Sequence, residues 1–106
     1  MIIIKPIEVK GHQVIGIEVT LPKTTLLAIT TEHGYIMCGA LDIRLLNEKL
    51  KERRIVAGRA VGVRTIEQLL DAPLDMVTLE AELHGIHPGM KGSDALVKMT
   101  DAVNYR

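Results

Sequence analysis

The spacing of apolar residues changes once along this chain, near residue 40, from the period of a strand to that of a helix. Before that point, apolar and β-branched runs at 2–10, 14–21, 25–31 and 35–38 are typical of strands. Short connections with turn residues separate these runs, so consecutive strands are expected to pair as antiparallel hairpins. From Asp42 onward, the apolar residues recur as they do on one face of a helix. The sequence therefore predicts a meander of strands followed by helices.

The second part of the chain is predicted to add helices and one more strand. A helix is expected over 42–54, a strand over 55–63, and a short helix over 65–70 whose first turn carries a capping box. Residues 74–86 are predicted to be a second helix, and their alternation leaves a strand as the alternative. A last helix is expected to start at Ser93, which can cap it.

Together these elements predict one domain over residues 1–106 with an α+β fold. The expected architecture is a two-layer α/β sandwich, in which helices cover one face of a mainly antiparallel sheet. A chain of 106 residues can bury a core without disulfides or metals. That core has to be aliphatic, because the sequence contains two tyrosines and neither Phe nor Trp.

Charge and hydropathy exclude several classes of partner. The charges of the 13 basic and 13 acidic residues cancel, and the chain has almost no aromatic side chains on which nucleobases could stack. Nucleic acid is therefore not expected as a partner. No apolar run reaches the roughly 18 residues that cross a bilayer, which argues against a membrane. A single cysteine and the lack of a signal peptide predict a cytoplasmic protein. The aliphatic first strand is expected at an open edge, so we predict a homo-oligomer that covers it.

Cys38 is the residue with the most reactive chemistry, and it is expected at a strand-to-helix junction. As a nucleophile it needs a base, for which His33 is one candidate and His84 or His87 the alternatives, and N–H groups near Gly39 could stabilise an oxyanion. The alternative interpretation, which we favour, is that Cys38 is a small buried apolar residue at a strand end.

Other polar groupings are interpreted as surface. His84 and His87 have a spacing compatible with metal ligation, but the glycine and proline beside them indicate a loop, so neither a metal nor a cofactor is expected. The charged run 48–54 and the pair Glu80 and Glu82 are interpreted as solvated helix faces.

Two predicted helix starts could hold a small anion, because backbone N–H groups point outward there. One follows Arg64, and the other follows the glycine-rich loop 88–93. The predicted ligand-binding residues are Gly39, Arg64, Thr65, Gly89, Lys91, Gly92 and Ser93. The alternative for the loop is a turn that needs glycine for its backbone conformation.

Three segments resemble a known family: 34–42 with Tyr-Ile-Met-Cys-Gly, 60–70 with Ala-Val-Gly-Val-Arg-Thr, and 85–96 with Gly-Met-Lys-Gly. They are similar to the YunC-like family of bacterial and archaeal proteins, a domain of unknown function. The resemblance extends over essentially the whole chain and implies a small two-layer α/β fold, with no established reaction or ligand. Ser93 and Asp94 stand where the family is expected to have an Arg-Glu pair, so an anion-binding role of that arginine does not transfer.

Two functions follow from the sequence. The first is a non-enzymatic module that binds a small anion or assembles with copies of itself. The alternative is a cysteine-dependent hydrolase or transferase with Cys38 as the nucleophile. The first is favoured because it requires no geometry that the sequence does not provide, and whether the protein is an enzyme stays open.

Overall fold

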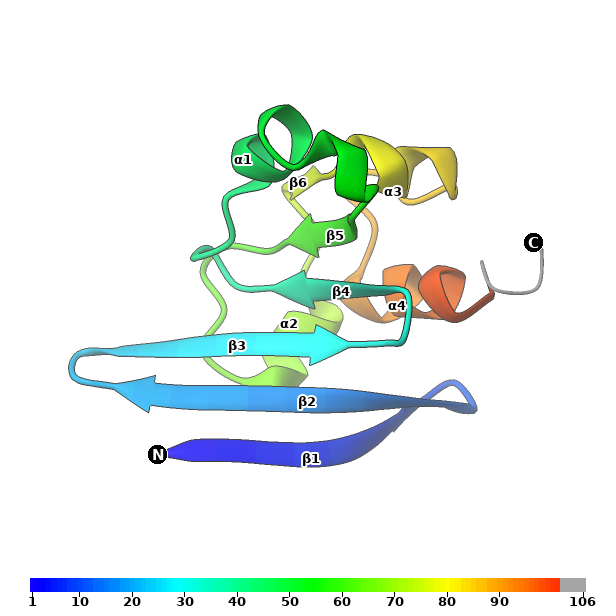
Figure 1. The fold of residues 1–106 in the computed structure, drawn as a ribbon. Coiled ribbons are helices and arrows are strands. Elements are labelled where there is room, and N and C mark those ends of the chain that lie inside the picture. The colour runs from blue at the N-terminus through cyan, green and yellow to red at the C-terminus, as the bar shows by residue number, and fades with distance from the viewer. Residues whose placement is uncertain (102–106) are drawn as a thin grey trace.

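The computed structural model of the chain describes residues 1–101, which form a mostly antiparallel sheet with helices on both sides (Figure 1). Along the chain the elements are β1 (Ile2–Val9), β2 (His12–Leu21), β3 (Thr24–Thr30), β4 (Gly34–Met37), α1 (Ile43–Glu48), the 3₁₀ turn η1 (Lys51–Arg53), β5 (Val56–Arg59), α2 (Ile66–Asp71), β6 (Met76–Val77), α3 (Leu79–Leu83) and α4 (Gly92–Asp101). The six strands lie side by side in the order of the sequence. Only β4 and β5 are parallel. The predicted α+β class and mainly antiparallel sheet are confirmed.

The four-strand meander is confirmed, and its turns explain it. Between β1 and β2, Lys10 and Gly11 have φ angles of 50° and 87°, as a tight hairpin turn requires. Lys23, between β2 and β3, has a φ of 61°. Between β3 and β4, the Thr31 hydroxyl accepts the N–H of Gly34 at 3.0 Å. These three turns reverse the chain within a few residues, so each strand pairs with the next.

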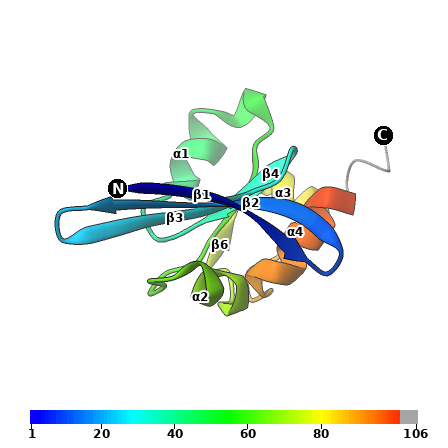
Figure 2. The same cartoon turned by 90° about the horizontal axis from the view of Figure 1, so that it is seen from below.

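The helices lie on both faces of the sheet, which differs from the prediction of a single covered face (Figure 2). In β4, Ile36 points into the main core under α2 and α4. On the other face, Ile43 and Leu46 of α1 pack on Ala57 of β5, with Tyr35 beside them. Consecutive residues of β5 are buried because each faces a different helix layer, as in a central strand of an α/β sheet.

Two predicted helices each divide into two elements. The segment predicted at 42–54 forms α1 and η1, and the segment predicted at 74–86 forms β6 and then α3. Both alternatives considered for 74–86 therefore hold for a part of it. The division occurs at Thr78, whose hydroxyl accepts the Ala81 N–H at 3.2 Å and so starts α3. The strand predicted at 55–63 is limited to β5, and the short helix predicted at 65–70 is confirmed as α2.

An ion pair joins β5 to the turn before β6. The Arg59 guanidinium contacts both carboxylate oxygens of Asp75, with Nη2 to Oδ2 at 2.7 Å and Nε to Oδ1 at 3.1 Å. Hydrogen bonds from Arg59 hold the pKa of Asp75 below its ordinary value. The pair thus stabilises the narrow end of the sheet, where β6 has two residues.

Candidate functional site

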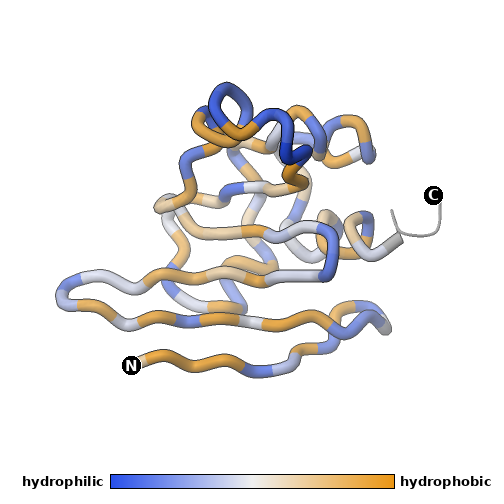
Figure 3. Tube along the Cα trace, in the orientation of Figure 1, coloured by the Kyte–Doolittle hydropathy of each residue, from blue (hydrophilic) through white to orange (hydrophobic). Residues whose placement is uncertain are grey.

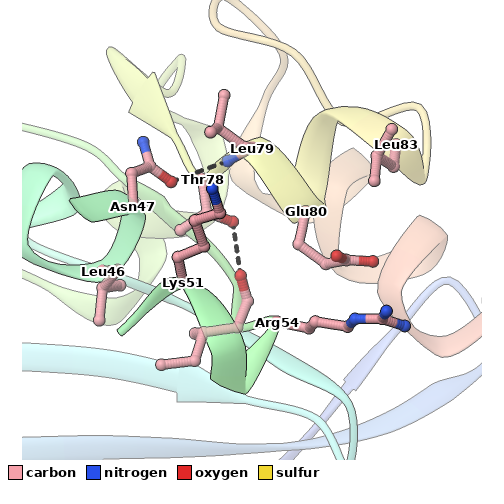
Figure 4. A pocket seen from close by; sticks show the side chains of 9 residues that line it. Leu46, Asn47, Lys51, Arg54, Thr78, Leu79, Glu80 and Leu83 are labelled. Carbon is pink, nitrogen blue, oxygen red and sulfur yellow. Dashed lines mark hydrogen bonds between the residues drawn. The ribbon is translucent and has the colours of Figure 1, made fainter. Parts of the chain in front are cut away.

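A cleft of about 240 Å³ lies where the connection between β4 and β5 meets the start of α3 (Figure 4). Leu46 of α1 and Ile55 form one wall, and Leu79 and Leu83 of α3 form the other. The cleft exists because β4 and β5 are parallel, so the connection between them has to cross over the sheet and carries α1 and η1 with it. Segments that are far apart in the sequence thus meet at one opening.

The floor of the cleft is built around Thr78, which is 2% exposed. Its hydroxyl donates to the carbonyl oxygen of Ile55 at 2.7 Å and accepts the N–H groups of Ala57 and Ala81, each at 3.2 Å. Asn47 adds a second link, since its side-chain oxygen accepts the Leu79 N–H at 2.9 Å. These bonds fix the two walls relative to each other, so the cleft is preformed. Because the Thr78 hydroxyl makes three hydrogen bonds within the protein, its role is structural.

Three charged side chains surround the opening: Lys51, Arg54 and Glu80 (Figure 4). The Glu80 carboxylate lies 3.4 Å from Nε2 of the His84 ring. Within residues 1–101, no carboxylate lies within 4.0 Å of the Lys51 ammonium or the Arg54 guanidinium. Arg54 has a left-handed backbone with a φ of 51°, held by its N–H donating to the Lys51 carbonyl at 3.2 Å. The opening therefore carries two cations without ion-pair partners among the described residues.

Cys38 lies at the predicted strand end and is buried, with 7% of its surface exposed. Its N–H donates to the Leu27 carbonyl at 3.1 Å, and its sulfur accepts the Leu27 N–H at 3.5 Å. Cys38 thereby continues the pairing of β4 with β3 by one residue. The sulfur packs in the main core of the protein.

The structure does not join the predicted catalytic residues. His33 lies at the opposite end of β4 from Cys38, with its ring 3.8 Å from the Glu32 carboxylate. His87 lies in the exposed loop between α3 and α4. Among the side chains of residues 1–101, neither ring forms a hydrogen bond with the sulfur of Cys38.

The predicted anion-binding residues lie at opposite ends of α2. At its first turn, Thr65 caps the helix by accepting the Gln68 N–H at 3.0 Å, and Arg64 is exposed beside the turn between β2 and β3. At its last turn, the Gly92 N–H donates to the Ala72 carbonyl at 3.1 Å. The N–H of Gly89 likewise donates to Leu74, at 2.7 Å.

The glycine-rich loop is therefore tied to the end of α2 and not open to a ligand at those two N–H groups. Lys91 is exposed and pairs with Pro73 through an isolated bridge, while Ser93 is half-buried. Gly39 is exposed after β4, separate from both predicted helix starts.

Residues 1–101 contain no group of three His, Cys, Asp or Glu side chains that could hold a metal ion. None of the helices formed by these residues is both long and apolar enough to span a bilayer.

The comparison with known proteins identifies the family. Residues 37–99 match the model of the family described as "Domain of unknown function (DUF1805)". The chain belongs to this family. A DUF1805 relative, the uncharacterized protein YunC of Bacillus subtilis (strain 168), is 62% identical over 99 residues, which cover 93% of this chain and 98% of that protein. The YunC-like resemblance seen in the sequence is thus confirmed.

A solved structure supports the fold of this DUF1805 protein. The crystal structure of a protein of unknown function, TA1206 from Thermoplasma acidophilum, is similar with a TM-score of 0.83. The two chains are 31% identical, and the similarity covers 93% of each. All residues that line the cleft fall within the part matched by the family model, whereas β1, β2 and β3 lie before it.

Sequence reasoning missed the cleft because its cations belong to a run that has the usual pattern of a solvated helix face. The helix α1 ends at Glu48, so Lys51 and Arg54 do not continue its outer face. Predicting this earlier helix end would have separated the two cations from the solvated helix face. The walls come from segments 46–55 and 78–83, and only the tertiary structure of this DUF1805 protein brings them together.

Proposed function

We propose that this protein is a non-enzymatic module that binds a small anion with an aliphatic part in the cleft between α1 and α3. The observation that carries the proposal is the pair of cations, Lys51 and Arg54, which open onto walls of leucine and have no carboxylate partner among residues 1–101. Two cations and one carboxylate, Glu80, give the opening a net charge of +1. An anion that also buries apolar surface fits both properties.

The size of the cleft selects a class of ligand. Pockets for drug-sized molecules have volumes of roughly 300–1,000 Å³, and this cleft, at about 240 Å³, lies below that range. A short-chain monocarboxylate matches it, with the carboxylate between Lys51 and Arg54 and the aliphatic chain against Leu79 and Leu83. Arginine binds carboxylates through two parallel hydrogen bonds, which adds orientation to the charge interaction.

A binding role is supported over catalysis by the state of the candidate nucleophiles, Thr78 in the floor of the cleft and Cys38 in the main core. The Thr78 hydroxyl makes three hydrogen bonds within the protein, and the Cys38 thiol is buried in the core. No contact among the described residues favours the cysteine-dependent alternative. A free buried thiol suits a reducing compartment, so we place this function in the cytoplasm.

Chemical-shift titration of the ¹⁵N-labelled protein with hexanoate tests the proposal, with neutral hexanamide as the matched ligand. We expect hexanoate to shift the amides of residues 46–55 and 78–83, and hexanamide to leave them unchanged. The double variant Lys51→Gln, Arg54→Asn should weaken binding about tenfold or more, since it removes two charge-assisted hydrogen-bond donors. Asparagine is chosen because it tolerates the left-handed backbone at Arg54.

The control variant is Lys49→Gln, which removes a cation from the same segment outside the cleft. It should bind hexanoate as the unmodified protein does, apart from a small salt-dependent loss. Shifts that map to other residues, or no shifts at about 10 mM hexanoate, would contradict the proposal, because binding weaker than this lies below the millimolar range of specific ligands.

A further inference from the structure

One face of the sheet is bare over β1, β2 and β3. Cross-strand partners point to the same side of a sheet, and the register aligns Ile2 with Val19 and Leu26 in one row. The bare sheet face is defined by five apolar side chains of this kind: Ile2, Ile4, Ile15, Ile17 and Val19. Ile2 is 66% exposed and Ile4 is 65% exposed. Figure 1 looks onto this face, and Figure 3 shows the apolar stretches along β1 and β2.

The helices leave this face uncovered. On the opposite side of the same strands, α2 packs against β2 and β3, and Gly16 approaches Ile66 there. On the side of the bare sheet face, α1 covers β5, at the other end of the sheet (Figure 2). An antiparallel sheet with one solvated face normally places polar residues on that face. Here the covered face carries the buried core residues Val14, Leu27 and Ile29, and the uncovered face is apolar as well.

Charged side chains are nearly absent from the bare sheet face. Following the alternation of the strands, Lys5 and Glu18 point to the covered side, where they border Thr65. Glu8, near the turn between β1 and β2, is the one charged residue that alternation places on the bare side of β1 to β3. Depletion of charge is the compositional mark of an interface core. The centre of this face offers nothing for a charged partner to recognise.

The open edge of β1 is less suited to pairing than its face. The Thr20 N–H donates to the Met1 carbonyl at 2.8 Å, and the Met1 amino group donates to the Thr20 carbonyl at 3.2 Å. Hydrogen-bonded and non-bonded positions alternate along an antiparallel pair, so every second residue of β1, beginning with Ile2, directs its own N–H and C=O groups away from β2. Ile2, Ile4 and Pro6 belong to this outward set. Pro6 has no N–H, so a strand added to this edge would lack a donor there.

We propose that the bare sheet face is the interface of a homodimer, in which two copies pack face to face about a two-fold axis. A second copy is the occupant that the surface chemistry selects, because a two-fold interface joins the same patch to itself and an uncharged patch does so without repulsion. Apolar surface on both sides is then removed from water.

The size of the face sets the strength of the dimer. Eight residues at about 3.3 Å and three strands at about 4.8 Å give a footprint of roughly 370 Å². This flat value is about half of the roughly 800 Å² per partner that standard interfaces bury, so the interface belongs to the small, reversible class. We therefore expect reversible association in the micromolar range.

Sedimentation velocity of the intact chain from about 1 to 300 μM tests the proposal, over the range expected for an interface of this size. The unmodified protein should shift from monomer to dimer with concentration. Ile4→Lys should raise the dissociation constant about a hundredfold or more, since each dimer carries the substitution twice. Because Ile4 is exposed in the single chain, this variant should fold, which circular dichroism checks, and Ile4→Thr is a second variant that retains strand preference.

Two control variants separate the face from other surfaces. Ile3→Lys changes the neighbouring residue of the same edge strand on the opposite side of the sheet, where Ile3 is 39% exposed. Leu83→Lys changes a leucine on α3 that is 78% exposed. Both should dimerise as the unmodified protein does. A loss of dimer equal in Ile3→Lys and Ile4→Lys would mean edge pairing and overturn the face-to-face model.

Other outcomes also overturn it. A monomer at every concentration refutes the dimer, and an unchanged dimer in Ile4→Lys refutes this interface. Vesicles of phosphatidylcholine that sediment a monomeric protein, and fail to sediment Ile4→Lys, would assign the face to a lipid surface instead.

Discussion

Replacing Thr78 by valine is expected to be among the most destabilising isosteric changes in this protein. The side chain keeps its shape, but three groups lose their partner: the N–H of Ala57, the N–H of Ala81 and the carbonyl of Ile55. The Ala57 N–H lies in a fully buried residue, so leaving it unpaired costs about 1–3 kcal/mol. Loss of the cap of α3 adds about 1 kcal/mol. The free energy of unfolding should therefore fall by about 3 kcal/mol.

Urea unfolding followed by far-ultraviolet circular dichroism measures this change, with Thr78→Ser as the matched variant. Serine keeps the hydroxyl and removes one methyl group, which costs about 0.8 kcal/mol. Thr65→Val is a second comparison, because Thr65 caps α2 at an exposed position with one hydrogen bond, and about 1 kcal/mol is expected there. If Thr78→Val and Thr78→Ser differ by less than about 1 kcal/mol, the hydroxyl does not join β5 to α3 energetically and the reasoning is refuted.

Three further predictions concern other parts of the molecule. Gly92→Ala should destabilise the protein by more than about 2 kcal/mol in the same urea assay, since its Cβ would lie 2.3 Å from the Leu69 carbonyl oxygen. Iodoacetamide should modify Cys38 far more slowly in the folded protein than in denaturant, because the sulfur is buried, and equal rates measured by mass spectrometry would contradict this. Asp75→Asn should cost less than about 1 kcal/mol at neutral pH, since the pair is partly exposed. Because Arg59 lowers the pKa of Asp75 in the folded protein, the ion pair stabilises the protein above the ordinary pKa of 3.8, and this stabilisation disappears as pH falls through the lowered pKa of the folded state. The difference in free energy of unfolding between the unmodified protein and Asp75→Asn should therefore shrink in acid.

The first part of the fold followed from local chemistry. Strand alternation and the turn residues between Lys10 and Thr31 determine the meander without reference to the rest of the chain. The later segments depend on tertiary contacts. Residues 74–86 have mixed spacing because Met76 and Val77 form β6, which pairs antiparallel with β5, and Thr78 then starts α3. Sequence periodicity averages over such short elements, so it could not divide them.

The candidate site was less accessible to sequence reasoning than the fold. The favoured interpretation of Cys38, a buried apolar residue at a strand end, agrees with the structure, where Cys38 pairs with Leu27 and its sulfur lies in the core. The helix starts near Arg64 and Gly92 were predicted, but not that the Gly92 N–H would be bonded to the end of α2. A cleft formed by the separate segments 46–55 and 78–83 has no local signature, and Lys51 alone looks like an ordinary surface cation.

The proline in β1 has a consequence for how this protein behaves while it is being made. A run of three isoleucines at an open edge is the kind of segment that starts amyloid-like stacking, in which every chain adds a strand to the one before. Lys5 and Pro6 follow that run directly, and a charge and a missing N–H donor both oppose such growth. A newly synthesised chain can therefore expose its isoleucines while the strand that carries them resists extension into a fibre.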